Sequence, residues 1–140
     1  MECYIKTLTT MKNILIIISL ILSFSVNAQV TELKLSGKQL TSFTYNDTLK
    51  NLQRLDLSDN YIQEIVIDSM KELIYINISV NMIDEVSILN ILKVLNANGL
   101  TTGWCYLDGG SNATIYKLNQ NMDYLMLKRK RWNITINELK

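Results

Sequence analysis

Apolar side chains recur in a fixed pattern along residues 30–83. Leucine, isoleucine or valine stands at the first, fourth, sixth and eleventh positions of segments 30–40, 52–62 and 73–83, which start 22 and then 21 residues apart. The alternation around the fourth and sixth positions is typical of a short strand with one buried face. The pattern therefore predicts three parallel strands that share one apolar interior.

A polar residue occupies the ninth position of each segment. Asn60 and Asn81 stand there in the second and third segments, and Lys38 stands there in the first. An asparagine amide offers donors and an acceptor, so we expect Asn60 to bind backbone groups left unpaired where the chain leaves its strand. We interpret Lys38 as the substitution of an end segment, one side of which faces water.

The apolar pattern changes after Asp84. Apolar residues now recur at helical spacing, at Val86, Ile88, Leu89, Ile91, Leu92, Val94 and Leu95. Asp84 can cap the first turn, and Gly99 lies where a helix end needs a residue with positive φ. We therefore expect a helix behind the sheet between these two residues.

The C-terminal part is expected to continue the sheet. Residues 104–113 predict a fourth strand followed by a glycine turn, residues 114–128 a second helix, and residues 132–137 a fifth strand. The inward side chains of the five strands are expected to form one row, made of Leu35, Leu57, Ile78, Leu107 and Ile134.

Outward side chains of stacked parallel strands form columns, because neighbouring strands lie about 4.8 Å apart. The first predicted column is Glu32, Arg54, Tyr75, Trp104 and Arg131. The second is Lys34, Asp56, Asn77, Tyr106 and Asn133. The third is Ser36, Ser58, Ser79, Asp108 and Thr135.

Aromatic side chains gather in the middle of these columns. We expect the partner-binding residues to be Arg54, Asp56, Tyr75, Asn77, Trp104 and Tyr106. Exposed aromatic rings beside an arginine are where binding energy concentrates. Two structural alternatives stay open: Trp104 packs on the preceding helix, or the opposite charges of neighbouring strands only stabilise the sheet face, by about 0.2–1 kcal/mol for each pair.

Residues 1–28 carry the parts of a secretory signal peptide, with a lysine before an apolar run and small residues at its end. We predict cleavage between Ala28 and Gln29. The apolar run is shorter than the roughly 20 residues that span a membrane as a helix, so a retained anchor is the less favoured alternative. We therefore predict a secreted or cell-surface protein with one folded domain, residues 29–140, and no stable membrane insertion after signal removal.

Composition argues against several kinds of chemistry. The chain has no histidine, the commonest general base and the commonest transition-metal ligand. Cys105 falls at an inward strand position, where we expect a small buried apolar group rather than a nucleophile. We therefore predict no enzyme, and no catalytic, cofactor or metal site. A hydrolase is the weakest alternative, because it would need a carboxylate pair that the sequence does not display.

Charge gives little indication of a partner. Residues 1–28 hold two lysines and one glutamate, so 12 basic and 12 acidic side chains remain. A neutral chain has no general attraction for nucleic acid, and we predict no nucleic-acid partner. The basic run 128–131 is interpreted as a solvated helix end, where the helix dipole favours cations.

Residues 30–83 resemble leucine-rich repeat proteins, whose repeats are roughly 20–29 residues long. Residues 87–137 are similar to the terminal repeats of short secreted leucine-rich repeat proteins of Bacteroidetes-type bacteria. The similarity rests on Leu92-Lys-Val-Leu followed by Gly99, on Leu107-Asp-Gly-Gly-Ser-Asn-Ala, and on Lys130-Arg-Trp-Asn-Ile-Thr-Ile-Asn. The resemblance implies an α/β solenoid of about five coils, with a parallel concave sheet and helices on the convex side of the C-terminal coils.

These observations predict a non-catalytic binding module that engages a protein or glycan through its concave sheet. The resemblance implies extracellular or cell-surface binding and supplies no catalytic residues. The alternative is a structural unit that self-associates through its edge strands, because unpaired strand edges can pair with another chain.

Overall fold

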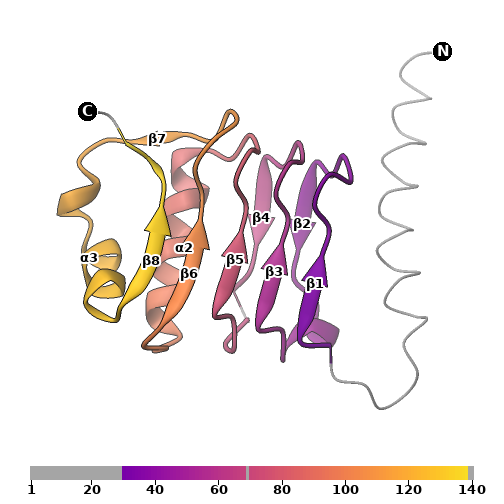
Figure 1. The fold of residues 1–140 in the computed structure, drawn as a ribbon, viewed down its shortest axis with the longest axis horizontal. Coiled ribbons are helices and arrows are strands. Elements are labelled where there is room, and N and C mark those ends of the chain that lie inside the picture. Colours follow the sequence, from indigo (N-terminus) through magenta and orange to yellow (C-terminus); the bar gives the residue numbers. More distant parts are fainter. Residues whose placement is uncertain (1–29, 69, 139–140) are drawn as a thin grey trace.

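The computed structural model describes residues 30–68 and 70–138. This part of the chain forms an α/β fold with a parallel sheet of five strands and two α-helices (Figure 1). The predicted signal peptide and its cleavage site between Ala28 and Gln29 lie outside the described residues.

The five-stranded sheet follows the order of the sequence. Its strands are β1 (Glu32–Lys34), β3 (Arg54–Asp56), β5 (Tyr75–Asn77), β6 (Gly103–Tyr106) and β8 (Trp132–Thr135), and each pairs in parallel with the next. Because parallel neighbours point the same way, the chain must return behind the sheet between them. The prediction of five parallel strands side by side is confirmed.

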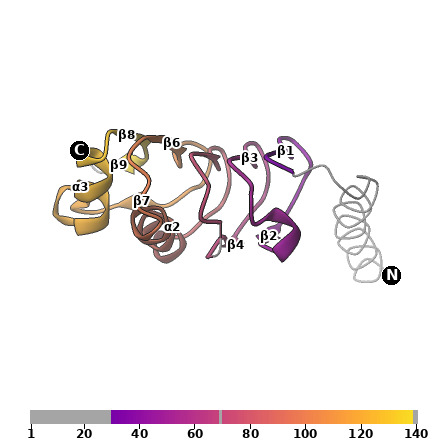
Figure 2. The same ribbon diagram turned by 90° about the horizontal axis from the view of Figure 1, so that it is seen from below.

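The returning segments form a second layer on one side of the sheet (Figure 2). This layer contains the paired strands β2 (Ser42–Thr44) and β4 (Glu64–Val66), then α2 (Glu85–Ala97) and α3 (Met122–Arg129). The 3-10 helices η1 (Asp47–Leu49) and η2 (Leu118–Gln120) and the parallel pair β7 (Thr114–Ile115) with β9 (Asn137–Glu138) complete the described elements.

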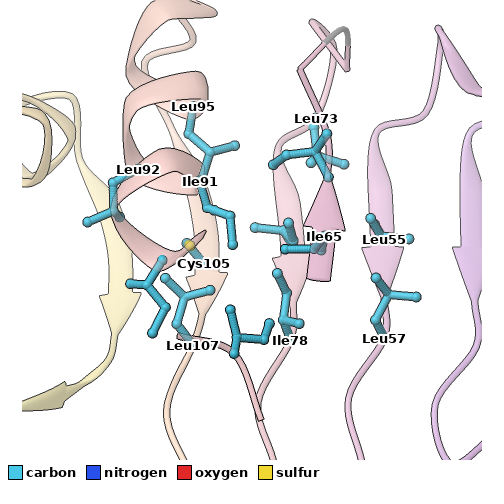
Figure 3. Packing of buried hydrophobic residues seen from close by; sticks show 14 of the residues in the cluster. Leu55, Leu57, Ile65, Leu73, Ile78, Ile91, Leu92, Leu95, Cys105 and Leu107 are labelled. Carbon is cyan, nitrogen blue, oxygen red and sulfur yellow. The ribbon is translucent and has the colours of Figure 1, made fainter. Parts of the chain in front are cut away.

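The core fills the space between the two layers. Figure 3 shows leucine and isoleucine side chains from the strands and from α2 filling it together with Cys105. Leu55, Ile76 and Cys105, which are register partners on adjacent strands, are 0% exposed. Burying one such leucine or isoleucine contributes about 1.5–3 kcal/mol, so stacking the segments is what stabilises each of them.

Helix α2 begins and ends as predicted. The Asp84 carboxylate accepts a hydrogen bond of 2.8 Å from the Ser87 backbone N–H, which also lowers the pKa of that carboxyl below its usual value. Gly99 takes φ +77° just after the helix, a conformation that costs glycine nothing.

The second helix begins later than predicted. The prediction was residues 114–128, but α3 starts at Met122 and the preceding residues form β7 and η2. Asn121 caps α3 by accepting a 2.9 Å hydrogen bond from the Tyr124 backbone N–H. Ile115, expected on the helix, is buried from strand β7 instead. Pairing of β7 with the distant β9 therefore replaces the first helical turns.

The register of the fifth strand was predicted two residues away from its true place. Asn133 and Thr135 pair with Trp104 and Tyr106, where Arg131 and Asn133 were expected. Ile134 accordingly stands beside Cys105 rather than Leu107.

The physical reason for this register is the pairing of Trp132 with Gly103. A Cβ on Gly103 would lie 2.6 Å from the Trp132 ring, so the ring occupies the space that glycine leaves open. The indole N–H donates to the Leu100 carbonyl at 3.1 Å, which satisfies the polar atom of this buried side chain.

Candidate binding surface

The six residues predicted to bind a partner lie on three adjacent strands. Strand β3 carries Arg54 and Asp56, β5 carries Tyr75 and Asn77, and β6 carries Trp104 and Tyr106. In the observed register the first residues of these pairs align, as do the second. Their neighbours in each strand are buried, so these side chains lie on the face turned away from the second layer. We call this group the sheet-face site.

Direct contacts hold the middle of the sheet-face site together. The Arg54 guanidinium carbon lies 4.3 Å from the centre of the Tyr75 ring, a cation–π contact worth about 0.5–1 kcal/mol at an exposed position. The Tyr75 and Tyr106 ring centres are 5.8 Å apart at 63°, an edge-to-face arrangement. On the other side, Arg54 Nε lies 3.5 Å from Glu32 Oε1. The rings are therefore ordered before any partner arrives.

Trp104 lies on the outer face of the sheet. Its strand neighbours Gly103 and Cys105 are buried, whereas Trp104 is 39% exposed. The alternative that it packs on the preceding helix is therefore wrong, because that helix lies behind the sheet. The indole instead stands in the column between Tyr75 and Asn133.

Serines donate hydrogen bonds to the polar side chains of the sheet-face site, Asp56 and Asn77. Asp56 Oδ1 accepts hydrogen bonds from the Ser58 N–H and hydroxyl at 3.0 and 2.7 Å. Asn77 Oδ1 accepts the same pair from Ser79 at 3.1 and 2.8 Å. Lys34 and Asp56 stand side by side on neighbouring strands as expected, but the ion pair of Lys34 is with Glu32 on its own strand, at 3.1 Å.

Asparagine side chains join successive loops by hydrogen bonds where the chain leaves the sheet. Asn60 Oδ1 accepts from the backbone N–H groups of Lys38 and Leu40 at 2.9 and 3.0 Å, and Nδ2 donates to the Leu35 and Leu57 carbonyls at 2.9 and 2.8 Å. The expected role of Asn60 is thus confirmed.

Two further asparagines repeat this arrangement. Asn81 Oδ1 accepts from the Ile62 N–H, and Asn112 Oδ1 accepts from the Ile83 N–H, each at 3.0 Å. All three asparagines are buried, whereas Lys38 in the first loop is exposed. The side chain at this position therefore reaches back to the preceding loop wherever a preceding loop is described.

Four residues with left-handed backbone occupy equivalent places in successive loops. They are Gly37, Asp59, Val80 and Gly109, with φ of +66°, +56°, +56° and +77°, and we call them the left-handed column. Backbone hydrogen bonds of 3.0–3.1 Å join each loop to the next here. Glycine and aspartate tolerate this conformation, but a β-branched valine is strained in it, by about 1–3 kcal/mol.

A groove of about 410 Å³ opens beside the left-handed column. Its lining residues are Gly37, Gln39, Asp59, Asn60, Tyr61, Val80, Asn81, Met82, Gly110 and Ser111. Tyr61, Val80 and Met82 are 57%, 45% and 43% exposed, although all three are large and apolar. The sequence pattern did not predict this groove. Its signal in the sequence was the apolar residue directly after Asn60 and Asn81.

The remaining candidate chemistry is limited. Burial of Cys105 raises the pKa of its thiol, which keeps the thiol protonated and unreactive. Lys130 from the basic run donates to the Asn96 backbone and side-chain oxygens at 2.8 and 2.7 Å, so this residue ties α3 to α2.

The described residues hold neither a metal-binding cluster nor a membrane-spanning helix. Within residues 30–68 and 70–138, no group of three acidic or cysteine side chains is placed to hold a metal ion. No helix in the same ranges has the length and apolar character to cross a membrane.

No protein-family model, curated protein or solved structure matches this chain.

Proposed function

We propose that the chain is a leucine-rich repeat solenoid of about five coils that acts as a secreted or cell-surface binding module. Three features support the architecture: apolar segments 22 and 21 residues apart, in-register parallel strands, and an asparagine that bridges successive loops. The proposed secreted location rests on the signal-peptide pattern of residues 1–28.

The observation that carries the binding role is the aromatic group of the sheet-face site. Tyr75, Trp104 and Tyr106 stand on the outer face of the sheet. The rings of Tyr75 and Tyr106 contact each other, and the Arg54 guanidinium contacts the Tyr75 ring. Rigid aromatic side chains contribute large contact areas with little loss of conformational freedom on binding. A protein or glycan that covers this face would meet these rings first.

The role is proposed to be non-catalytic. Asp56, the carboxylate among the six residues of the sheet-face site, accepts two hydrogen bonds from Ser58, which suits a structural or ligand-orienting group better than a general base. The thiol of Cys105 lies inside the core and cannot reach a substrate on the sheet face. The same arrangement needs no cofactor.

A glycan array and a peptide display library, both probed with the purified protein, test this proposal. The double variant Tyr75→Ala/Tyr106→Ala should lose at least about tenfold in affinity for any ligand so found, because two central rings are removed. Tyr116→Ala is the matched control, since Tyr116 directly follows β7, is exposed and lies outside the sheet-face site. Ligands that bind the double variant and the wild type equally would refute the sheet-face role.

Self-association is the second candidate function. Within the described residues, β1 and β8 are the outermost strands and each pairs with one neighbour only. A second copy could extend the sheet at either edge. Lys38 opposes this at the β1 edge. It stands at the place where the later loops have an asparagine that bonds to the preceding loop, and a lysine side chain has no oxygen to accept such bonds. Light scattering tests the self-association candidate. A monomer at micromolar concentration would remove it.

A further inference from the structure

The groove beside the left-handed column is separate from the sheet-face site. The loops that follow β1, β3 and β5 lie side by side along one edge of the sheet, beyond the ends of the strands (Figure 1). None of the residues that line the groove belongs to the six of the sheet-face site. A ligand in the groove would therefore bind to the edge of the molecule rather than to its face.

One wall of the groove is apolar and held in place. Val80 keeps a valine side chain on left-handed backbone where the same column has glycine at positions 37 and 109. A Cβ on Gly110 would lie 2.7 Å from Val80 Cα, so the next loop packs tightly against this residue. Glycine or asparagine would adopt this backbone with less strain, so the exposed Val80 side chain is the candidate contact for an apolar ligand group.

The lining of the groove carries one charged side chain, which is the acidic Asp59. The Asp59 carboxylate is exposed, and it forms no hydrogen bond or ion pair with another described residue. Tyr61, two residues later on the same loop, adds an exposed aromatic ring. An acidic group beside an aromatic ring favours a cation and disfavours an anion.

We propose that this groove binds a peptide segment through a basic side chain, lysine or arginine. The cationic end would lie between the Asp59 carboxylate and the Tyr61 ring, and the aliphatic stem would lie along Val80 and Met82. This assignment uses both properties of the groove, because lysine and arginine join a long apolar stem to a charged tip. It is independent of the sheet-face proposal.

The test uses isotopically labelled protein and short peptides, followed by NMR. The probe is a capped peptide with one lysine flanked by leucines, and the matched peptides carry glutamate or norleucine in its place. We expect the lysine peptide to shift the backbone resonances of Asp59, Tyr61 and Met82. The glutamate peptide should bind at least about tenfold more weakly, and raising the salt concentration should weaken the lysine peptide alone.

Two variants connect the binding to named groups. Asp59→Asn keeps a residue that tolerates φ +56° and removes only the charge, so it should weaken the lysine peptide about tenfold and leave norleucine unchanged. Asp68→Asn, with the same change of net charge outside the groove, is its control. Val80→Gly removes the apolar wall, so it should weaken the lysine and norleucine peptides alike without lowering the melting temperature.

Several results would overturn the proposal. They are equal binding of the lysine and glutamate peptides, full binding to Asp59→Asn, and no resonance shift at millimolar lysine peptide. Resonance shifts confined to Tyr75 and Tyr106 would place the peptide on the sheet-face site instead, and would likewise refute the assignment to the groove.

Discussion

Replacing Asn81 by alanine tests the idea that buried asparagines join the successive loops. The Asn81 side chain is 2% exposed and bonds to both its own loop and the preceding one. Its Oδ1 accepts from the Ile62 N–H at 3.0 Å, and its Nδ2 donates to the Leu57 and Ile78 carbonyls at 3.0 and 3.1 Å. Alanine would leave the Ile62 N–H without a side-chain acceptor. The Leu57 and Ile78 carbonyls would still accept from other asparagine side chains.

The loss of stability can be worked out from these contacts. A buried polar group left without a hydrogen bond costs about 1–3 kcal/mol. The Ile62 N–H has only this acceptor among the described residues, whereas carbonyls tolerate a missing bond better. With one buried donor left unsatisfied, we expect Asn81→Ala to lower the free energy of unfolding by about 1–3 kcal/mol. This is a large share of the about 5–15 kcal/mol that stabilises a typical domain.

Urea denaturation followed by circular dichroism measures this loss. Lys38→Ala is the matched control, because Lys38 stands at the equivalent place in the first loop and its side chain is exposed. The control should change stability by less than about 0.5 kcal/mol. A loss below about 1 kcal/mol for Asn81→Ala, at an unchanged slope of the denaturation curve, would refute the reasoning.

Two further changes test other contacts of the fold. Gly103→Ala should destabilise the protein by about 1–3 kcal/mol and alter tryptophan fluorescence, because the new Cβ would lie 2.6 Å from the Trp132 ring. Unchanged fluorescence and an unchanged urea midpoint would contradict the packing described. Asp84→Ala should destabilise α2 above the ordinary carboxyl pKa of 3.8, and this difference from wild type should disappear as the pH falls through the lowered pKa of the folded state. Urea midpoints of both proteins, measured across the acid range, check this, and a constant difference at every pH would count against the cap.

The two candidate surfaces differ in how they are built. The sheet-face site consists of side chains on strands, held by ring contacts and by the Asp56 and Asn77 hydrogen bonds. The groove consists of loop residues whose backbone is fixed by the asparagines and by left-handed turns. Variants at the two surfaces should therefore act independently, since no residue belongs to both.

The repeated spacing was sufficient to predict the first three strands, and continuing their outward columns past the expected helix placed the fourth. From Glu32 through Arg54 and Tyr75 to Trp104, each predicted neighbour is the observed one. The reason is that strand alternation and the length of each return are local properties, which the apolar pattern records directly. Asp84 and Gly99 were predictable in the same way, because helix caps depend on residues within one turn.

Contacts between distant residues decided the rest. The register of β8 depends on the fit of Trp132 over Gly103, and the late start of α3 depends on β7 pairing with β9. The groove arises because Val80 and the neighbouring loops meet at one edge of the sheet. These features depend on which side chains meet after the chain has folded, and a pattern read along the chain does not contain that information.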